Sequence, residues 1–373
     1  LLSLQAAAEG AEPSPVTGPA SASASAVPVT PLASDIVTVN NRGELADTTA
    51  TSALAAARDA GATAVIARSA SIGMTEVRRG GNGVQIAPQG YAHPMGTTVL
   101  PLEMVARTMG RTISAKLTAD TVVMGALTAG LRGAQAGDTI TLIASNGTPT
   151  VFTVAMIGDD ATIGGTELLM SPAAANRLGI SQSSSVVIWN FRSRAAIDAA
   201  LTAHGLVDTK IRISRSWDPF DPDFTLGMAR TKQALGEFTY RVNANGSVTL
   251  DPNWMSSYIT YGSIGGLRLS SGCNVNVRPA LQAAMDEVIA SGLAGTINYA
   301  DANSAGGCVG PRFNRLTPDS SVGFLSRHSW GQAIDTNTRG SCQGCAPPDL
   351  DCRTVQIFRK HGFAWGGNFL VPD

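Results

Sequence analysis

The distribution of cysteine along the chain is the feature that most restricts how it can fold. The sequence has 373 residues, and its five cysteines all lie in the C-terminal part, at Cys273, Cys308, Cys342, Cys345 and Cys352. Cysteines gathered in this way are typical of an extracellular domain held together by disulfides. The odd number leaves one thiol without a partner in the sequence, and the Cys-x-x-Cys pair keeps a structural zinc site open as an alternative. The chain therefore divides into a part without cysteine and a disulfide-bearing part.

A stretch rich in proline, alanine and serine predicts a spacer at the N-terminal end. Residues 9–34 contain almost no bulky apolar side chain, so they bury too little surface to offset the entropy lost on ordering. We interpret residues 1–34 as a flexible spacer that holds a domain away from a membrane or cell wall. Residues 1–8 (LLSLQAAA) are consistent with the end of a removed signal peptide, the end of a membrane anchor or a frayed chain start.

Residues 35–215 predict an N-terminal α+β domain. Apolar periodicity and turn residues predict strands, hairpins and helices. The strands are expected at residues 36–40, 62–68 and 185–191, the hairpins at 76–88 and 137–157, and the helices at 51–60, 120–131, 171–180 and 194–205. No catalytic group of side chains is recognisable in this domain, because His93 and His204 each stand alone in the sequence. We therefore expect a structural or protein-binding module.

The run of residues 125–160 resembles the extracytoplasmic domains of MacB- and FtsX-type permeases. That resemblance implies that residues 35–215 bind an envelope or membrane protein. Nucleic acid is not expected as a partner, because the net charge is −1 and the sequence has no long basic run. No complete transmembrane helix is expected either, since no apolar window of about 18 residues occurs.

A second α+β domain is predicted over residues 216–373. Two Asp-Pro pairs at residues 215–223 break regular structure and mark the boundary. Beyond it we expect a hairpin at residues 238–250, a helix that starts near Asp251, and helices at 228–236 and 279–292.

The stretch FLSRHSWGQAIDTN contains the residues that carry chemistry. It has the pattern Ser326-x-His328-x-x-Gly331-x-Ala333-x-Asp335. If GQAID enters a strand, Gly331, Ala333 and Asp335 point to one face, and the two small residues leave room beside a metal. His328, in the turn before the strand, reaches the same point. Imidazole nitrogen and carboxylate oxygen are normal zinc ligands, and a catalytic zinc has three protein ligands and a water. The pattern therefore predicts a zinc site that uses His328 and Asp335.

This pattern closely resembles the signature of the LAS metallopeptidases. That group includes the VanX and VanY D,D-peptidases, the phage L-Ala-D-Glu endopeptidases and the metal-binding domain of hedgehog proteins. The final stretch, TVQIFRKHGFAWGGNFLVPD, resembles the end of the same domain. The resemblance implies a small antiparallel sheet that carries Zn²⁺, and a secreted or membrane-anchored bacterial enzyme. Its substrate would be a peptidoglycan stem peptide in the cell wall, cleaved as a D,D-carboxypeptidase or as an endopeptidase.

The resemblance also implies roles for individual residues. Arg312, with Arg315 in reserve, matches the family arginine that contacts the substrate and the developing oxyanion, and a surface salt bridge is the alternative for either residue. Asp373 falls on the general base, and the third zinc ligand, a histidine, is expected three positions after it. Ser326 is expected to orient the loop or to bind the substrate. Trp330 is expected to line the substrate groove or to pack in the core.

Two other functions stay open from the sequence. The peptidase-like domain is alternatively an inactive module that binds wall peptides or an envelope protein, as in the hedgehog branch. A histidine at the third position after Asp373 would favour the enzyme, and a residue that cannot bind metal would favour the binding module. In a third hypothesis, residues 35–215 have the main role as an envelope scaffold.

Overall fold

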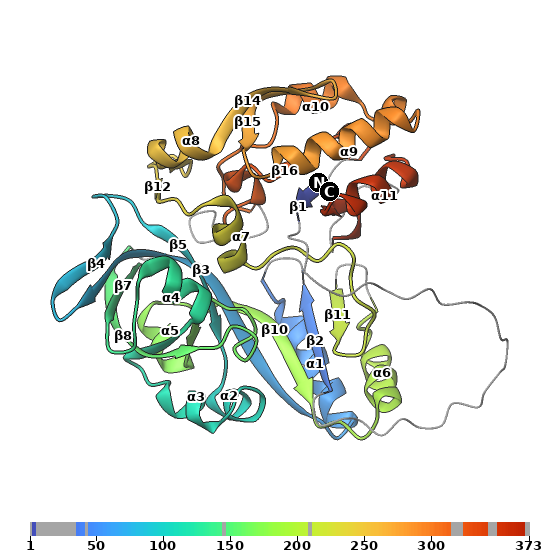
Figure 1. Ribbon diagram of the computed structural model, residues 1–373. Coiled ribbons are helices and arrows are strands. Elements are labelled where there is room, and N and C mark those ends of the chain that lie inside the picture. The colour runs from blue at the N-terminus through green and yellow to red at the C-terminus, as the bar shows by residue number, and fades with distance from the viewer. Residues whose placement is uncertain are drawn as a thin grey trace.

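The computed structural model describes residues 2–4, 35–41, 44–143, 147–207, 211–314, 324–341 and 349–369. Helices and strands are mixed throughout these residues, as the α+β prediction requires. Figure 1 shows a barrel at the lower left, an open sheet with two helices beside it, and the C-terminal residues above both. Within the described ranges, no helix is both long and apolar enough to cross a membrane.

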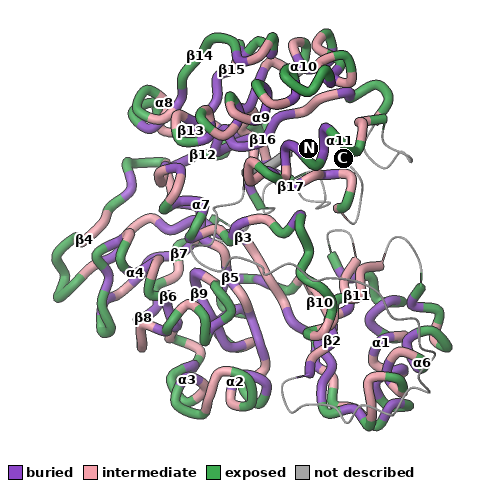
Figure 2. The backbone as a smooth tube through the Cα atoms, turned by 45° about the vertical axis from the view of Figure 1, so that its right-hand side comes forward, coloured by how far each residue is buried: buried purple, intermediate pink, exposed green. Residues whose placement is uncertain are grey.

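Six of the described strands close a barrel. Hydrogen-bonded neighbours run in the order β3-β5-β9-β6-β8-β7, and β7 pairs with β3 again. Their bounds are β3 (Thr63–Arg79), β5 (His93–Val99), β6 (Thr121–Gly125), β7 (Thr139–Ile143), β8 (Pro149–Gly158) and β9 (Leu168–Met170). Four short helices accompany them, namely α2 (Leu102–Thr108), α3 (Arg111–Lys116), α4 (Ala126–Arg132) and α5 (Pro172–Arg177). The hairpin arm β4 (Asn82–Ile86) extends from β3 and is largely exposed (Figure 2).

The long strand β3 joins the barrel to an open antiparallel sheet. Beyond β3 the strand order continues through β10 (Ser183–Trp189), β2 (Ile36–Asn41) and β11 (Ile211–Arg215). Helices α1 (Asp47–Asp59) and α6 (Arg194–Ala203) pack on this sheet and share its apolar cluster. Because β3 has 17 residues, its first half pairs with β10 and its second half closes the barrel.

The prediction of one helix over residues 120–131 is wrong. Thr121–Gly125 form strand β6, and helix α4 begins only at Ala126. Residues 122–124 are fully buried, and β6 pairs with both β8 and β9. Burial between two neighbouring strands thus overrides the helical pattern, as is common for β-branched runs.

Several local predictions are confirmed. The side chain of Ser171 accepts a hydrogen bond from the backbone of Ala174 and so caps α5. Likewise, Asp251 caps helix α8 (Pro252–Tyr258) through the backbone of Asn253. The predicted hairpins at residues 76–88 and 238–250 pair as expected, and the arms of the third, β7 and β8, do so too.

The C-terminal residues form two short hairpins, a small sheet and a set of helices. The hairpins are β12 (Tyr240–Val242) with β13 (Val248–Leu250), and β14 (Ile259–Ile264) with β15 (Leu267–Asn274). The small antiparallel sheet has the order β16 (Ala333–Ile334), β1 (Leu2–Leu4), β17 (Phe363–Trp365). The helices are α7 (Met228–Leu235), α8, α9 (Arg278–Ala290), η1 (Ala294–Thr296), α10 (Tyr299–Ala305), η2 (Arg327–Trp330), α11 (Cys352–Lys360) and η3 (Gly366–Asn368).

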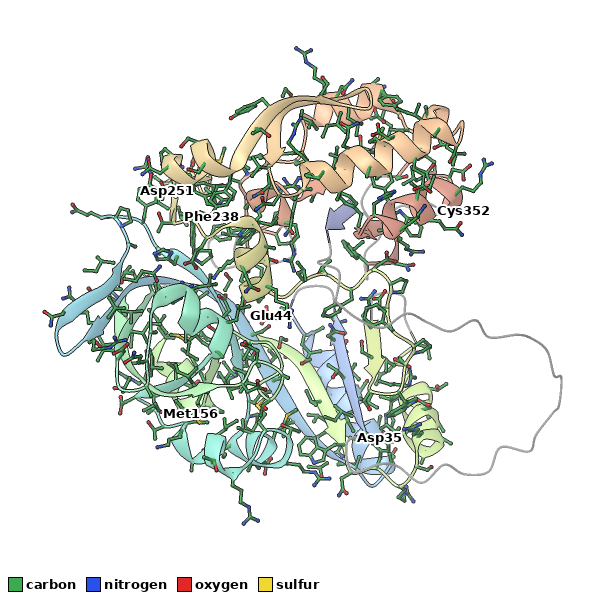
Figure 3. All side chains as sticks on the ribbon, viewed as in Figure 1. Asp35, Glu44, Met156, Phe238, Asp251 and Cys352 are labelled. Atoms are coloured by element: carbon green, nitrogen blue, oxygen red, sulfur yellow. A yellow bond between two sulfur atoms is a disulfide. The ribbon has the colours of Figure 1, made fainter. Side chains whose placement is uncertain are left out.

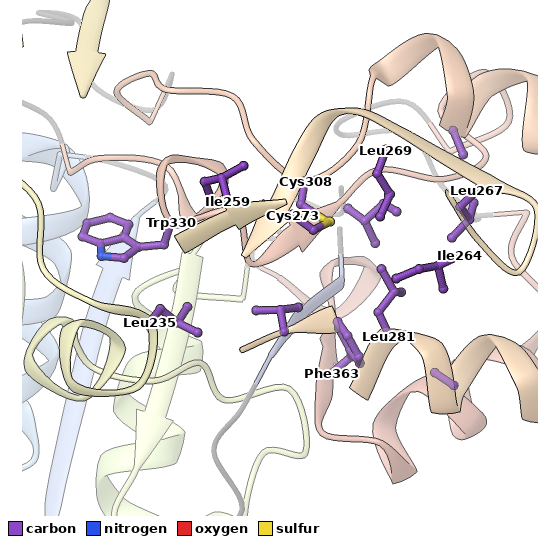
Figure 4. Close-up of a cluster of buried hydrophobic side chains, with 14 of the residues drawn as sticks. Leu235, Ile259, Ile264, Leu267, Leu269, Cys273, Leu281, Cys308, Trp330 and Phe363 are labelled. Carbon is purple, nitrogen blue, oxygen red and sulfur yellow. A yellow bond between two sulfur atoms is a disulfide. The ribbon is translucent and has the colours of Figure 1, made fainter. Parts of the chain in front are cut away.

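One hydrophobic cluster holds the C-terminal residues together. It includes Trp330, Phe238, Leu281 and the disulfide between Cys273 and Cys308. Figure 4 shows this disulfide in the middle of the cluster, with Trp330 toward Leu235 of α7. The residues before the predicted boundary have clusters of their own. The boundary at residues 215–223 and the role of residues 1–34 as a spacer stay predictions, although residues 2–4 of that stretch pair with β16 and β17 in the small sheet.

Candidate metal centre

A tight turn presents the predicted metal ligand His328. In this turn, residues 326–331 (hereafter the His328 turn), the hydroxyl of Ser326 accepts a hydrogen bond of 3.3 Å from the backbone N–H of His328. Gly331 ends the turn in the left-handed region, with φ of 63°. A Cβ on Gly331 would lie 3.0 Å from the backbone nitrogen of Asn274. Serine and glycine are therefore needed at these positions to form and pack the turn.

The expectation that Gly331 shares a strand face with Ala333 and Asp335 is wrong. Strand β16 contains only Ala333 and Ile334, and Gly331 belongs to the turn before it. The left-handed conformation at Gly331 reverses the chain, so strand alternation cannot begin there. Asp335 follows directly after β16.

The two imidazole nitrogens of His328 have different surroundings. Its Nδ1 lies 3.1 Å from the carbonyl oxygen of Cys308, which can only accept, so Nδ1 carries the proton in the neutral ring. Its Nε2 is buried and has no hydrogen-bond partner among the described residues. The ring is only 3% exposed. In this tautomer Nε2 carries a lone pair that can bind a cation.

Asp335 lies opposite this nitrogen. Its Oδ1 is 3.4 Å from Nε2 of His328. Burial raises the pKa of Asp335, but the neighbouring imidazole and the charge of Arg312 lower it more, so that the net pKa lies below the usual value. The carboxylate is therefore charged at neutral pH, as metal binding requires.

The spacing of these two atoms fits zinc. With zinc–nitrogen and zinc–oxygen distances near 2.0–2.1 Å and tetrahedral angles, two ligand atoms are about 3.4 Å apart. At that distance the imidazole nitrogen and the carboxylate oxygen can share one cation, as two ligands of a single metal do. Within the described ranges, no group of three histidine, cysteine, aspartate or glutamate side chains is close enough to hold a metal. His328 and Asp335 would thus supply two of the three protein ligands that a catalytic zinc needs.

Arg312 lies beside these two residues. Antiparallel hydrogen bonds place its segment, since Ser326 N donates to Arg312 O (2.8 Å) and Gly310 N donates to His328 O (3.0 Å). Its guanidinium donates to the carbonyl of Gly310 at 3.3 Å. A Cβ on Gly310 would come within 2.7 Å of Nη1 of Arg312, so glycine lets the guanidinium lie against the backbone there. Arg312 makes no ion pair with any described residue, and both its predicted role and the salt-bridge alternative stay open.

The other predicted site residues have different outcomes. The indole of Trp330 has no exposed surface and packs on Phe238, with ring centroids 4.7 Å apart. The core-packing alternative describes Trp330, and no surface is left for a substrate. Arg315 and Asp373 lie outside the described residues, so their roles stay predictions.

The cysteines agree in part with the prediction. Cys273 and Cys308 form a disulfide, as expected for a domain held together by disulfides. Cys352 is free and exposed at the start of α11 (Figure 3). The two other cysteines, at positions 342 and 345, lie outside the described residues.

Comparison with protein families supports a peptidase site at this point. Residues 319–373 match the family described as D-alanyl-D-alanine carboxypeptidase. This match confirms the resemblance read from the sequence, and it indicates a peptidase. It includes Ser326, His328, Asp335 and Asp373, whereas Arg312 precedes it. No curated protein matches the chain.

The backbone carbonyl of Cys308 is the functional group that the sequence did not reveal. It fixes the ring of His328 from a position 20 residues earlier in the chain. The same residue forms the disulfide with Cys273, and a crosslinked backbone is a rigid place for such a contact. A carbonyl has no sequence code of its own, so only the fold shows which one is used.

Proposed function

We propose that the chain is a zinc-dependent peptidase that hydrolyses peptidoglycan stem peptides, as a D,D-carboxypeptidase or as an endopeptidase. One observation carries the proposal. The unpartnered Nε2 of His328 faces Asp335 at 3.4 Å, within a segment that matches D-alanyl-D-alanine carboxypeptidases. Substrate peptides of this family end in D-alanine, which gives the substrate class.

Each residue of the proposed site has its own role in the reaction. When bound, zinc polarises the scissile carbonyl and lowers the pKa of water toward neutrality. His328 and Asp335 would hold it through Nε2 and Oδ1. Arg312, with its permanent charge, would stabilise the negative charge that develops on the carbonyl oxygen. Asp373, placed by the family pattern, would accept the proton of the attacking water.

Ser326 supports the site without attacking the substrate. Its hydroxyl accepts the hydrogen bond from the backbone of His328, so it is engaged in holding the turn. None of the described contacts of this hydroxyl is with a general base, and a serine nucleophile requires one. We therefore assign Ser326 to orienting His328 rather than to nucleophilic catalysis.

We further propose an extracytoplasmic location, supported by the disulfide between Cys273 and Cys308. For residues 35–215 we propose binding to an envelope or membrane protein. A pull-down with the full chain, compared with one in which the exposed β4 hairpin is replaced by a two-residue turn, tests this idea. Equal recovery of envelope proteins by both would count against binding through that hairpin.

The first experiment measures zinc. Elemental analysis is done on the encoded protein, including whatever residues follow Asp373, and on His328→Ala and Asp335→Asn. We expect about one zinc per chain in the parent and a large loss in both variants. His361→Ala is the matched control. His361 lies at the end of α11, and its imidazole is hydrogen-bonded to Glu287 of α9 rather than to a residue of the candidate metal site. No zinc in the parent would contradict the peptidase and leave the peptide-binding module.

Activity is then measured on two substrates. A stem peptide ending in D-Ala-D-Ala reports carboxypeptidase activity, and a crosslinked peptide dimer reports endopeptidase activity. Arg312→Met should lower kcat for the preferred peptide about 100-fold or more while zinc content stays near the parent value. Loss of zinc in Arg312→Met would show that this residue supports the fold rather than the reaction.

A further inference from the structure

Helix α7 lies between the barrel and the His328 turn. Figure 1 shows it below the C-terminal helices and above the barrel, and its consecutive residues Thr231 and Lys232 are both fully buried. Successive residues on a helix point about 100° apart. One of these side chains bonds to the His328 turn and the other to the barrel.

Arg327 makes the bond to the turn. Its Nη1 donates to the hydroxyl of Thr231 at 2.7 Å. Its Nη2 donates to the hydroxyl of Thr225 at 3.3 Å and to the carbonyl of Leu226. Arg327 forms no ion pair with a described residue, and the three acceptors of its guanidinium are neutral groups in α7 or just before it. The residue next to His328 is thus hydrogen-bonded to α7 and to two residues shortly before it.

Lys232 makes the bond to the barrel. Its Nζ donates to Oε1 of Glu167 at 2.6 Å and to the carbonyl of Pro94. Both acceptors belong to the barrel, Pro94 within β5 and Glu167 just before β9. A second ion pair joins the same two parts. Nη2 of Arg132, in α4 beside the barrel, lies 2.7 Å from Oε1 of Glu237, which follows the end of α7. Breaking one member of a buried group of charges leaves the others uncompensated, so this junction is stiff.

Asn274 forms a second link between α7 and the turn. Its side-chain nitrogen donates to the carbonyl of Leu235 (2.9 Å), at the end of α7, and to the carbonyl of Trp330 (3.2 Å). Its backbone N–H donates to the carbonyl of Gly331 at 3.0 Å. Asn274 has no exposed surface. The turn is therefore held on both sides of His328, at Arg327 before it and at Trp330 and Gly331 after it.

We propose that α7 is a positioning element through which the barrel fixes the place of His328, with Arg327 as the positioning residue. A metal ligand must be held to a fraction of an ångström, and partners one step away from the metal usually change affinity 10- to 100-fold. The claim about metal affinity rests on the proposed function, while the claim about the rigidity of the turn does not. The barrel thereby gains a role in holding the His328 turn.

The test uses the full chain and starts without metal. Hydrogen exchange is measured on peptides that cover residues 326–334 in the parent and in Arg327→Met. Backbone amides at Ser329 and Gly331 are bonded within the turn, so their exchange reports its opening. We expect exchange in this peptide to rise about 10-fold or more. Arg194→Met is the matched control, because Arg194 is also half-buried and forms a bidentate pair, with Asp35 in the other half of the protein.

Three more variants locate the coupling. Thr231→Val removes an acceptor of Arg327 with little change of shape, and the double variant with Arg327→Met should be less than additive. Arg327→Lys keeps the positive charge but loses the planar guanidinium that donates to several acceptors at once. Its effect on exchange in the turn should therefore lie between those of the parent and Arg327→Met. Lys232→Met should also speed exchange in the turn, although Lys232 bonds to Glu167 and Pro94 of the barrel and lies 3.6 Å from Glu237, and not to the turn itself. If Arg327→Met does not fold, Thr231→Val carries the test.

Zinc affinity is the second measurement. It should fall 10- to 100-fold in Arg327→Met and stay within about twofold in Arg194→Met. Unchanged hydrogen exchange in both Arg327→Met and Thr231→Val would overturn the proposal that α7 positions the His328 turn. Unchanged exchange in Lys232→Met would overturn the claim that the barrel holds the turn through α7. If the parent binds no zinc, the proposed function fails, and hydrogen exchange still decides whether α7 positions the turn.

Discussion

Removal of the disulfide between Cys273 and Cys308 should weaken both the fold and the candidate site. The two cysteines are 35 positions apart, and both are buried in the main cluster of the C-terminal residues. Closing a loop of that length stabilises the folded state by about 4 kcal/mol in the chain-entropy view. The same crosslink fixes the backbone of Cys308, whose carbonyl oxygen accepts the hydrogen bond from His328.

The perturbation is the double variant Cys273→Ala/Cys308→Ala. A loss of about 4 kcal/mol in a domain of this size corresponds to a fall in Tm of about 8–16 °C. We expect zinc affinity to fall about 10-fold as well, because the carbonyl that orients His328 is no longer anchored. Calorimetry measures the first quantity, and competition with a chelator measures the second. Cys352→Ala is the control, because Cys352 is free and exposed.

Two results would refute this reasoning separately. A Tm within about 1 °C of the parent would show that the loop is restrained without the crosslink, contrary to the entropy estimate. A lower Tm with unchanged zinc affinity would show that the contact between His328 and Cys308 does not depend on the crosslink. In that case the disulfide would stabilise the domain without tuning the site.

Three further predictions concern single residues. Trp330→Ala should cost about 3–5 kcal/mol in urea unfolding, because its indole is fully buried, and unchanged stability would contradict a core role. Gly331→Ala should cost about 1–2 kcal/mol or more, because its φ is 63°, and a neutral effect would mean that the turn relaxes. Burial lowers the pKa of His93 to about 4 from 6.5. The unfolded chain therefore binds more protons between these values, and stability should fall by up to about 3 kcal/mol as the pH drops through this window. The slope should largely vanish in His93→Gln, and an equal slope there would assign it to other groups.

The local features of this protein are largely readable from its sequence. Ser171 and Asp251 cap helices that are expected to start at these residues, because capping depends on a side chain and a backbone group only two or three residues away. The proximity of the two predicted ligands is readable for the same reason. His328 and Asp335 lie seven positions apart, and a short turn is enough to bring them together. Such features need little help from the rest of the fold.

The features that depend on distant pairing are not readable in this way. Closure of the barrel requires β3 to pair with β7, and β6 becomes a strand only because β8 and β9 lie on either side of it. Its residues 122–124 fit a helical pattern equally well when considered alone. The contact between Cys308 and His328 is a further case, since a backbone carbonyl leaves no trace in the residue types. Tertiary context decides these elements.

The signature around His328 therefore carries two kinds of information. Its fixed positions shape the turn, since Ser326 caps it and Gly331 ends it in the left-handed region. Its open positions attach the turn to this particular scaffold. Arg327 bonds to α7, Ser329 contacts the backbone of Arg312 at 3.4 Å, and Trp330 packs on Phe238. A turn of this kind placed on another scaffold would keep its shape but lose these attachments. The residues that the signature leaves open should thus determine how rigidly His328 is held and, with it, how strongly the site binds its metal.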